Sequence, residues 1–78
     1  MRRIRILISG RVIGVSFRYF IEDNANKLNI KGWVRNTEDG KVEAVFEGKK
    51  EDVDKLIKLC RKGPWAARVD NLELKEEK

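Results

Sequence analysis

The stretch GRVIGVSFR, residues 10–18, contains the side chains best suited to chemistry in this chain. It follows an alternating apolar run, and Gly10 and Gly14 allow a short loop before a helix predicted from Phe17. The unpaired N–H groups of a first helical turn, together with the helix dipole, favour a bound anion. Arg18 lies in that turn and can hold two oxygens at once. The pattern indicates either an anion site or a plain turn followed by a solvated arginine.

A second candidate is Asn36, at the end of a predicted strand, where it shares a face with apolar Ile30 and Val34. A neutral amide can donate to a phosphate without the repulsion that a carboxylate would bring. The same residue type is also common where a strand enters a hairpin. On the residues alone, Asn36 is either part of a site beside the loop or a cap of the hairpin.

The composition excludes several kinds of active site. The chain has no histidine and one cysteine, so it offers no His-based triad, no His metal ligand and no CxxC pair. Cys60 lies on the apolar face of a predicted helix, where we expect it to pack rather than to react. We therefore expect no metal carriage of the kind that some small domains perform.

Size and charge narrow the protein class further. With 78 residues and 41% apolar content, the chain predicts one domain, residues 1–78, around one core. It shows no membrane-spanning apolar run and no signal-type apolar block after MRRIR. A lone cysteine favours the cytoplasm. The net charge of +5 is interleaved with acidic residues, which is consistent with a solvated surface or with a field that attracts anions.

Alternation and helical spacing predict six secondary-structure elements. They are strand 3–9, a helix from Phe17 to about Asn29, a hairpin over 31–48, helix 51–62 ended by Gly63-Pro64, and strand 67–75. A tight turn is expected at Asp39-Gly40. A bulge is expected near Asp70-Asn71, because Val69 is out of phase with Leu72 and Leu74.

The order strand, helix, strand, strand, helix, strand predicts an α+β fold, the ferredoxin-like βαββαβ sandwich. Right-handed crossovers place both helices on one face of an antiparallel four-stranded sheet. The predicted core consists of Ile4, Ile6, Ile8, Phe17, Ile21, Leu28, Val42, Phe46, Val53, Leu56, Ile57 and Leu74.

Four segments in order, GRVIGVSFR, GWVRN, DGKVEAVFEG and GPWAARV, resemble the acylphosphatases from about residue 3 to about residue 74. The resemblance implies hydrolysis of the carboxyl–phosphate anhydride of small acyl phosphates, without metal or cofactor, to a carboxylate and inorganic phosphate. It implies acetyl phosphate, carbamoyl phosphate and 1,3-bisphosphoglycerate as substrates. It also implies that Arg18 grips the phosphate and that Asn36 orients the attacking water. The implied phosphate-binding loop is Val12, Ile13, Gly14, Val15, Ser16, Phe17 and Arg18.

The implied reaction suits a chain without histidine. A carboxylate leaving group has a conjugate-acid pKa of roughly 4 to 5, so it departs without being protonated by a general acid. The protein then has to position water and stabilise charge on the phosphoryl oxygens. Backbone N–H groups, a guanidinium and an amide can do both.

The chain departs from the family pattern in two places. Ile13 stands where the family usually has glutamine, and we expect it to alter contacts at the rim of the site or the substrate preference, and not the backbone donors. The sequence ends at KEEK, whereas family members commonly continue into another short strand. A sheet edge left open there would favour weak self-association or reduce the stability, so we expect either a monomer or weak self-association.

Two other functions are consistent with the same element order. RNA-recognition modules share it and favour basic surfaces, but they need clustered aromatic residues on the central strands. Here KGWVRN contributes only Trp33, and Phe46 is expected to face the helices. We therefore expect no nucleic-acid partner. The third possibility is a catalytically silent relative that acts as a sensing or interaction domain.

Overall fold

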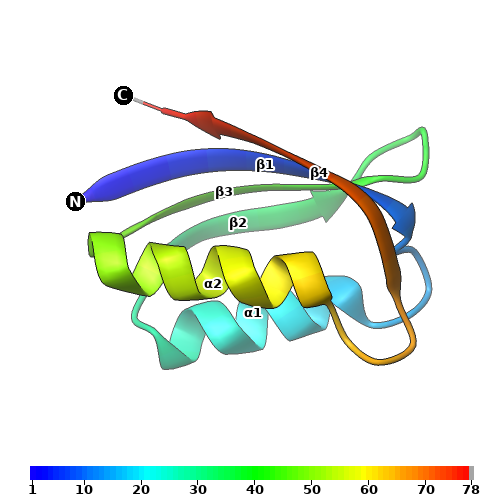
Figure 1. Cartoon of the computed structure of the whole chain (residues 1–78), viewed down its shortest axis with the longest axis horizontal. Coiled ribbons are helices and arrows are strands. Elements are labelled where there is room, and N and C mark those ends of the chain that lie inside the picture. Colours follow the sequence, from blue (N-terminus) through cyan, green and yellow to red (C-terminus); the bar gives the residue numbers. More distant parts are fainter. Residues whose placement is uncertain (78) are drawn as a thin grey trace.

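The computed structural model describes residues 1–77, so Lys78 of the predicted domain lies outside it. The elements are β1 (Arg2–Arg11), α1 (Phe17–Lys27), β2 (Lys31–Asn36), β3 (Val42–Gly48), α2 (Lys50–Lys62) and β4 (Arg68–Glu76). The strands form one antiparallel sheet in the order β2-β3-β1-β4, and both helices cover the same face (Figure 1). The predicted ferredoxin-like α+β fold is confirmed. Neither helix has the length and apolar content that a membrane crossing requires.

One hydrophobic core lies between the sheet and the helices. The alternating residues Ile4, Ile6 and Ile8 of β1 are fully buried there, as the period of two predicts. Three residues predicted for the core, Leu28, Ile57 and Leu74, are only half-buried and pack against its margin. The positions of two of them explain the partial exposure. Leu28 follows the end of α1, and Leu74 lies on the edge strand β4. The core also contains Val12, Ala25, Ile30, Ala44 and Cys60.

Cys60 packs as the sequence predicts. It is completely buried on the inner face of α2, and desolvation raises the pKa of its thiol to about 12. A thiol that is both inaccessible and protonated is not a nucleophile at neutral pH. Its role in this fold is to fill space.

The predicted turn and bulge are both present. At the hairpin, Gly40 has φ of 82° and its N–H donates to the Thr37 carbonyl over 3.2 Å. Between β1 and β4 the register shifts, with Ser9 opposite Asn71 and Gly10 opposite Val69. β1 therefore continues two residues beyond its predicted end, and Gly10 belongs to the strand rather than to a turn. A Cβ at Gly10 would lie 2.2 Å from the Arg68 carbonyl oxygen, so the close approach at the bulge requires glycine.

The open face of the sheet is covered by charged and aromatic side chains. Arg5, Val45 and Trp33 are neighbours across three strands, and the Arg5 guanidinium lies 5.8 Å from the centre of a Trp33 ring. This cover leaves Val45 only 1% exposed although it points away from the helices. Strand alternation alone does not predict that burial.

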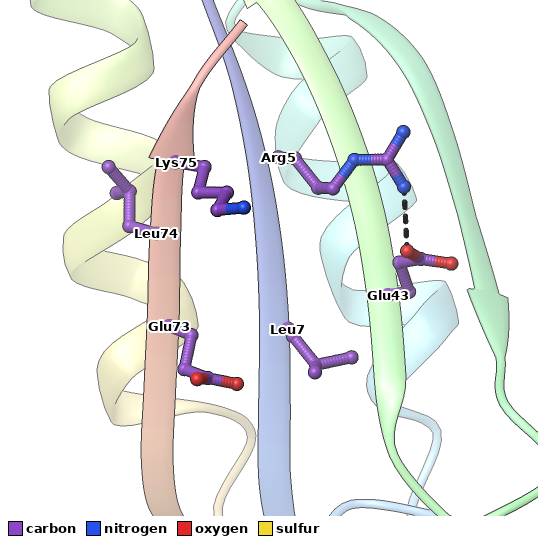
Figure 2. A pocket seen from close by; sticks show the side chains of 6 residues that line it. All are labelled: Arg5, Leu7, Glu43, Glu73, Leu74 and Lys75. Atoms are coloured by element: carbon purple, nitrogen blue, oxygen red, sulfur yellow. Dashed lines mark hydrogen bonds and ion pairs between the residues drawn. The ribbon is translucent and has the colours of Figure 1, made fainter.

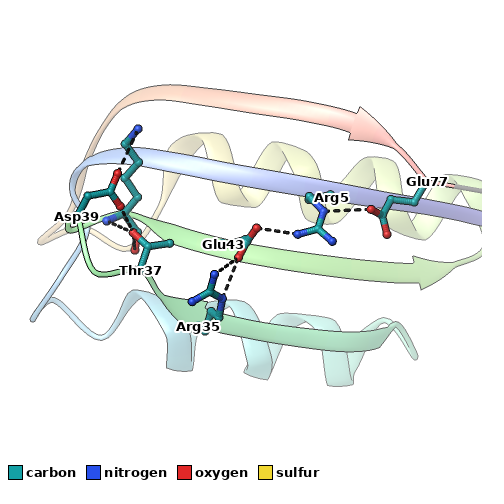
Figure 3. A network of polar contacts seen from close by, with 7 residues as sticks. Arg5, Arg35, Thr37, Asp39, Glu43 and Glu77 are labelled. Atoms are coloured by element: carbon teal, nitrogen blue, oxygen red, sulfur yellow. Dashed lines mark hydrogen bonds and ion pairs between the residues drawn. The ribbon is translucent and has the colours of Figure 1, made fainter.

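Arginines and glutamates on this face form a connected network (Figure 3). Arg5 donates to Glu43 over 2.7 Å and to Glu77 over 3.0 Å, while Arg35 donates to the second oxygen of Glu43 over 2.8 Å. The hydrogen bond from Arg5 lowers the pKa of both glutamates, although their partial desolvation opposes the shift. The network joins β1, β2, β3 and the residue that follows β4.

We expect the Glu43 network to stabilise the fold above the carboxyl's unfolded pKa of about 4.3. Its folded pKa is depressed, so the contribution is complete above the unfolded value and is lost as pH falls through the folded value. Glu43→Gln should therefore lower the urea midpoint at pH 7, and the difference from the parent should shrink at pH 3. Glu38→Gln, at an exposed turn position, is the matched control. Equal midpoints for Glu43→Gln and the parent at pH 7 would contradict this role.

Candidate active site

The loop over residues 12–16 joins β1 to α1 and turns sharply before the helix begins. Two of its residues have positive φ, Gly14 at 76° and Ser16 at 61°. Among residues 1–77, the N–H groups of residues 13–16 donate to no protein acceptor. The first helical hydrogen bond runs from the Phe20 N–H to the Ser16 carbonyl over 3.0 Å, which leaves the earlier N–H groups of the first turn outside the helical ladder. The loop and helix start thus present a run of free donors.

Most residues of this loop line a pocket of about 370 Å³, together with Asn36 from the sheet. Val42 pairs with Ile8 of β1 on one side and with Asn36 of β2 on the other. The end of β2 therefore lies level with Ile8, three residues before β1 ends at Arg11 and the loop begins. Asn36 shares the helix-facing side of its strand with half-buried Val34. The pocket is lined by Val12, Ile13, Gly14, Ser16, Phe17, Arg18, Tyr19 and Asn36.

The structure therefore brings Arg18, Asn36 and most of the predicted loop together. Val15 is the exception, since it is half-buried against the core and does not line the pocket. Tyr19 lines the pocket but is absent from the residues that the sequence predicts for the site. Its only signal in the sequence is an aromatic residue beside Arg18, two positions from the inward-facing Phe17.

Arg18 differs from the arginines of the sheet in its electrostatic surroundings. Within residues 1–77, no carboxylate lies within ion-pair distance of its guanidinium. Arg5 and Arg35, in contrast, are both bound to Glu43. The five donors of the Arg18 guanidinium are consequently available to an anion.

A larger pocket, of about 530 Å³, lies on the open face of the sheet (Figure 2). Arg5, Glu43, Glu73 and Lys75 line it with mixed charge, and Arg5 and Glu43 bind each other. Because its carboxylates would repel an anion, this pocket is a weaker candidate for phosphate than the loop. The described residues contain no group of three or more potential metal ligands.

Comparison with known proteins identifies the family. Residues 4–78 match the protein-family model for acylphosphatase. A protein of Rubrobacter xylanophilus named acylphosphatase is 50% identical over 76 residues, which are 97% of this chain and 69% of that protein. An acylphosphatase of Chloroflexus aurantiacus is 53% identical over 72 residues, covering 92% of this chain and 78% of that one. The chain belongs to the acylphosphatase family.

The fold agrees with this assignment. The crystal structure of acylphosphatase from Bacillus subtilis superposes with a TM-score of 0.95 at 35% identity, over 99% of this chain and 86% of that one. The predicted membership and acylphosphatase activity are confirmed. The similarity therefore favours a phosphatase over an RNA-binding module.

We expect Gly14 to matter for phosphate binding because of its backbone conformation. A Cβ there would contact nothing within 4 Å, so Gly14→Ala introduces strain at φ of 76° without a clash. Relaxing that strain turns the adjacent N–H groups away, and restoring them costs about 1 kcal/mol, or about fivefold in phosphate affinity. Titration with inorganic phosphate measures the loss.

Gly40→Ala is the matched control for Gly14→Ala. Gly40 also has positive φ, at 82°, and open space around the added Cβ, but it lies in the hairpin turn. Both variants should lose similar stability, and only Gly14→Ala should lose phosphate affinity. Equal phosphate binding in the two would contradict a role for the loop.

Proposed function

We propose that the loop pocket binds the phosphoryl group of a small acyl phosphate and that Arg18 and Asn36 act on it there. The observation that carries the proposal is the meeting of free loop N–H groups, an unpaired guanidinium and an amide in one pocket. All of these groups donate hydrogen bonds, and a phosphoryl group is an acceptor on each of its terminal oxygens. We further propose that residues 1–78 act as one domain and need no metal or cofactor for the reaction.

Phosphate binding is assigned to the loop residues Val12, Ile13, Gly14, Val15, Ser16 and Phe17 and to Arg18. The Val12 N–H donates to the Gly10 carbonyl over 3.1 Å, so the free backbone donors of the loop begin at Ile13. The N–H groups after Gly14 lie at the positive end of the α1 dipole, which strengthens their attraction to negative charge. The Arg18 fork matches two phosphoryl oxygens at once. These contacts fix the phosphorus atom relative to the sheet.

Asn36 has a different role, because it reaches the pocket from β2 rather than from the loop. Its amide orients a water molecule in line with the bond to the acyl oxygen. The water oxygen bonds to phosphorus, the P–O bond to the acyl group breaks, and its electron pair leaves on the carboxylate. The water gives up its protons to solvent and to the product phosphate. In a loose transition state the charge lies on the phosphoryl oxygens, where Arg18 and the N–H groups stabilise it.

The pocket volume of about 370 Å³ suits a small molecule. Nucleic acid is not proposed as a partner, because the arginines on the open face are bound to glutamates. We propose a cytoplasmic location, because the free buried thiol of Cys60 is compatible with a reducing compartment. We propose a monomer or weak self-association, because the edge strands β2 and β4 can each pair with a strand of another copy.

Arg18→Lys should weaken phosphate inhibition and lower turnover together. Lysine keeps the charge but loses the planar fork that holds two oxygens. Acetyl phosphate kinetics without added metal, beside a phosphate titration, measure both effects. Arg61→Lys, at an exposed position of α2 outside the pocket, should change neither. If Arg18→Lys binds phosphate as tightly as the parent, the proposed two-oxygen contact of the Arg18 guanidinium with the phosphoryl group is wrong.

Asn36→Ala should instead separate turnover from binding. Loss of one transition-state donor is expected to reduce kcat by about 10²–10³-fold. Inorganic phosphate should bind nearly as well as to the parent, because the product needs no oriented water. Asn26→Ala, which removes an exposed asparagine of α1, controls for the loss of an amide. Normal turnover in Asn36→Ala, or a matching loss of phosphate affinity, would rule out water positioning.

A further inference from the structure

The loop pocket has an apolar side that phosphate binding does not use. The large apolar side chains that remain exposed in residues 1–77 are Met1, Ile13, Tyr19, Trp33 and Trp65. Two of them, Ile13 and Tyr19, line this pocket, where they are 42% and 72% exposed. Arg18 lines the same pocket, so a hydrogen-bond donor and the apolar side chains of Ile13 and Tyr19 lie together in one small cavity.

The positions of Ile13 and Tyr19 are not explained by packing. Val12 enters the core at 2% exposure, whereas the next residue, Ile13, projects into the pocket instead. Phe17 is 1% exposed, and Tyr19 lies two residues later, about 200° around the helix at 3.6 residues per turn. Neither of these exposed side chains belongs to the core. The acyl group of a small acyl phosphate carries a carbon substituent, and such a substituent can pack against apolar side chains beside the phosphate site.

We propose that Ile13 and Tyr19 form the subsite for the acyl group and that it selects apolar, uncharged acyl chains or rings. The proposal rests on the proposed function, because it requires the phosphoryl group to lie against the loop and Arg18. With the phosphorus fixed there, the carbonyl carbon is two bonds away and its substituent emerges along the pocket wall. An aromatic or branched aliphatic substituent buries carbon surface on the Tyr19 ring and the Ile13 side chain.

The charge of the pocket points to the same substrates. Arg18 is the charged residue among those that line it, and the phosphoryl group engages that guanidinium. An acyl group that carries a second phosphate would place its charge against Ile13 and Tyr19, with loss of hydration. Among acyl phosphates, the subsite therefore favours benzoyl and butyryl phosphate over acetyl phosphate, and all three over 1,3-bisphosphoglycerate.

The test compares kcat/KM for acetyl, butyryl and benzoyl phosphate in the parent and in Tyr19→Ala and Ile13→Gln. Both residues are exposed, so both variants should fold, and thermal melting verifies it. In the parent, kcat/KM should rise in the order acetyl, butyryl, benzoyl. Tyr19→Ala should reduce the benzoyl-to-acetyl ratio about fivefold, less than the roughly 10-fold or greater effect of a group in an enclosed pocket. The change should appear in KM, because contact with the acyl carbons is equal in ground and transition states.

Two variants serve as controls. Tyr19→Phe keeps the ring and should retain the parent's ratio. Trp65→Ala removes an aromatic side chain that is 98% exposed and lies outside the pocket, and it should also retain the ratio. An unchanged ratio in Tyr19→Ala and Ile13→Gln, or an equal loss for all substrates, would overturn the subsite. Failure of the phosphate site is distinguishable, since it appears as acetyl phosphate turnover that does not respond to Arg18→Lys.

Discussion

The pairing of β3 with both β1 and β2 is the constraint on which the site depends. Val42 pairs with both Ile8 and Asn36, so one residue of β3 fixes where the end of β2 lies relative to β1. A shift of one residue in the β2–β3 register would turn Asn36 to the open face of the sheet, where Glu43 of β3 lies, and away from the loop. The hairpin turn at Gly40 holds that register through the hydrogen bond between Gly40 and Thr37. The geometry of the proposed site is thus a consequence of strand pairing, although the loop supplies most of its donors.

The molecule separates the arginines that stabilise the fold from the arginine assigned to the reaction. On the open face, Arg5 and Arg35 share Glu43, so both guanidinium groups have a carboxylate partner. Arg18 lies on the helix side, at the start of α1, without a carboxylate within reach in residues 1–77. An ion pair at Arg18 would have to be broken before phosphate could bind. Leaving the guanidinium solvated avoids that cost and keeps its fork available.

Much of this arrangement follows from the sequence, because period and turn chemistry are local. The alternation of Ile4, Ile6 and Ile8 and the Asp39-Gly40 turn are sufficient to predict the sheet. Contacts between distant segments are not local, and here sequence reasoning fails. Val45 is buried because Arg5 and Trp33 flank it from two other strands, and Gly10 is required because Arg68 approaches it at a bulge. Each of these facts depends on a partner more than ten residues away.

The candidate site shows the same division. Arg18 and the loop are recognisable in one short segment, whereas the place of Asn36 depends on two registers. Tyr19 escapes sequence reasoning for another reason. An exposed aromatic residue in a first helical turn has no periodic signature, and only the shape of the pocket shows which surface it covers. Val15 is the opposite case, since its place in the loop suggests a site residue while its side chain packs inward.

The remaining question is how so small a chain holds a strained loop in place. Ser16 has φ of 61°, a left-handed conformation that costs a non-glycine residue about 1–2 kcal/mol. The loop is anchored on both sides of that strain, by Val12 at 2% and Phe17 at 1% exposure. Phe17 also packs against Phe20 and against the backbone of Gly63, where an added Cβ would lie only 2.9 Å from the ring. The residue that follows α2 therefore packs against the start of α1. Burial of Val12 and Phe17 offsets the backbone strain at Ser16, which lies between them in the chain. Because its conformation is held in this way, the loop would need little reorganisation to stabilise charge on the phosphoryl oxygens of the proposed substrate.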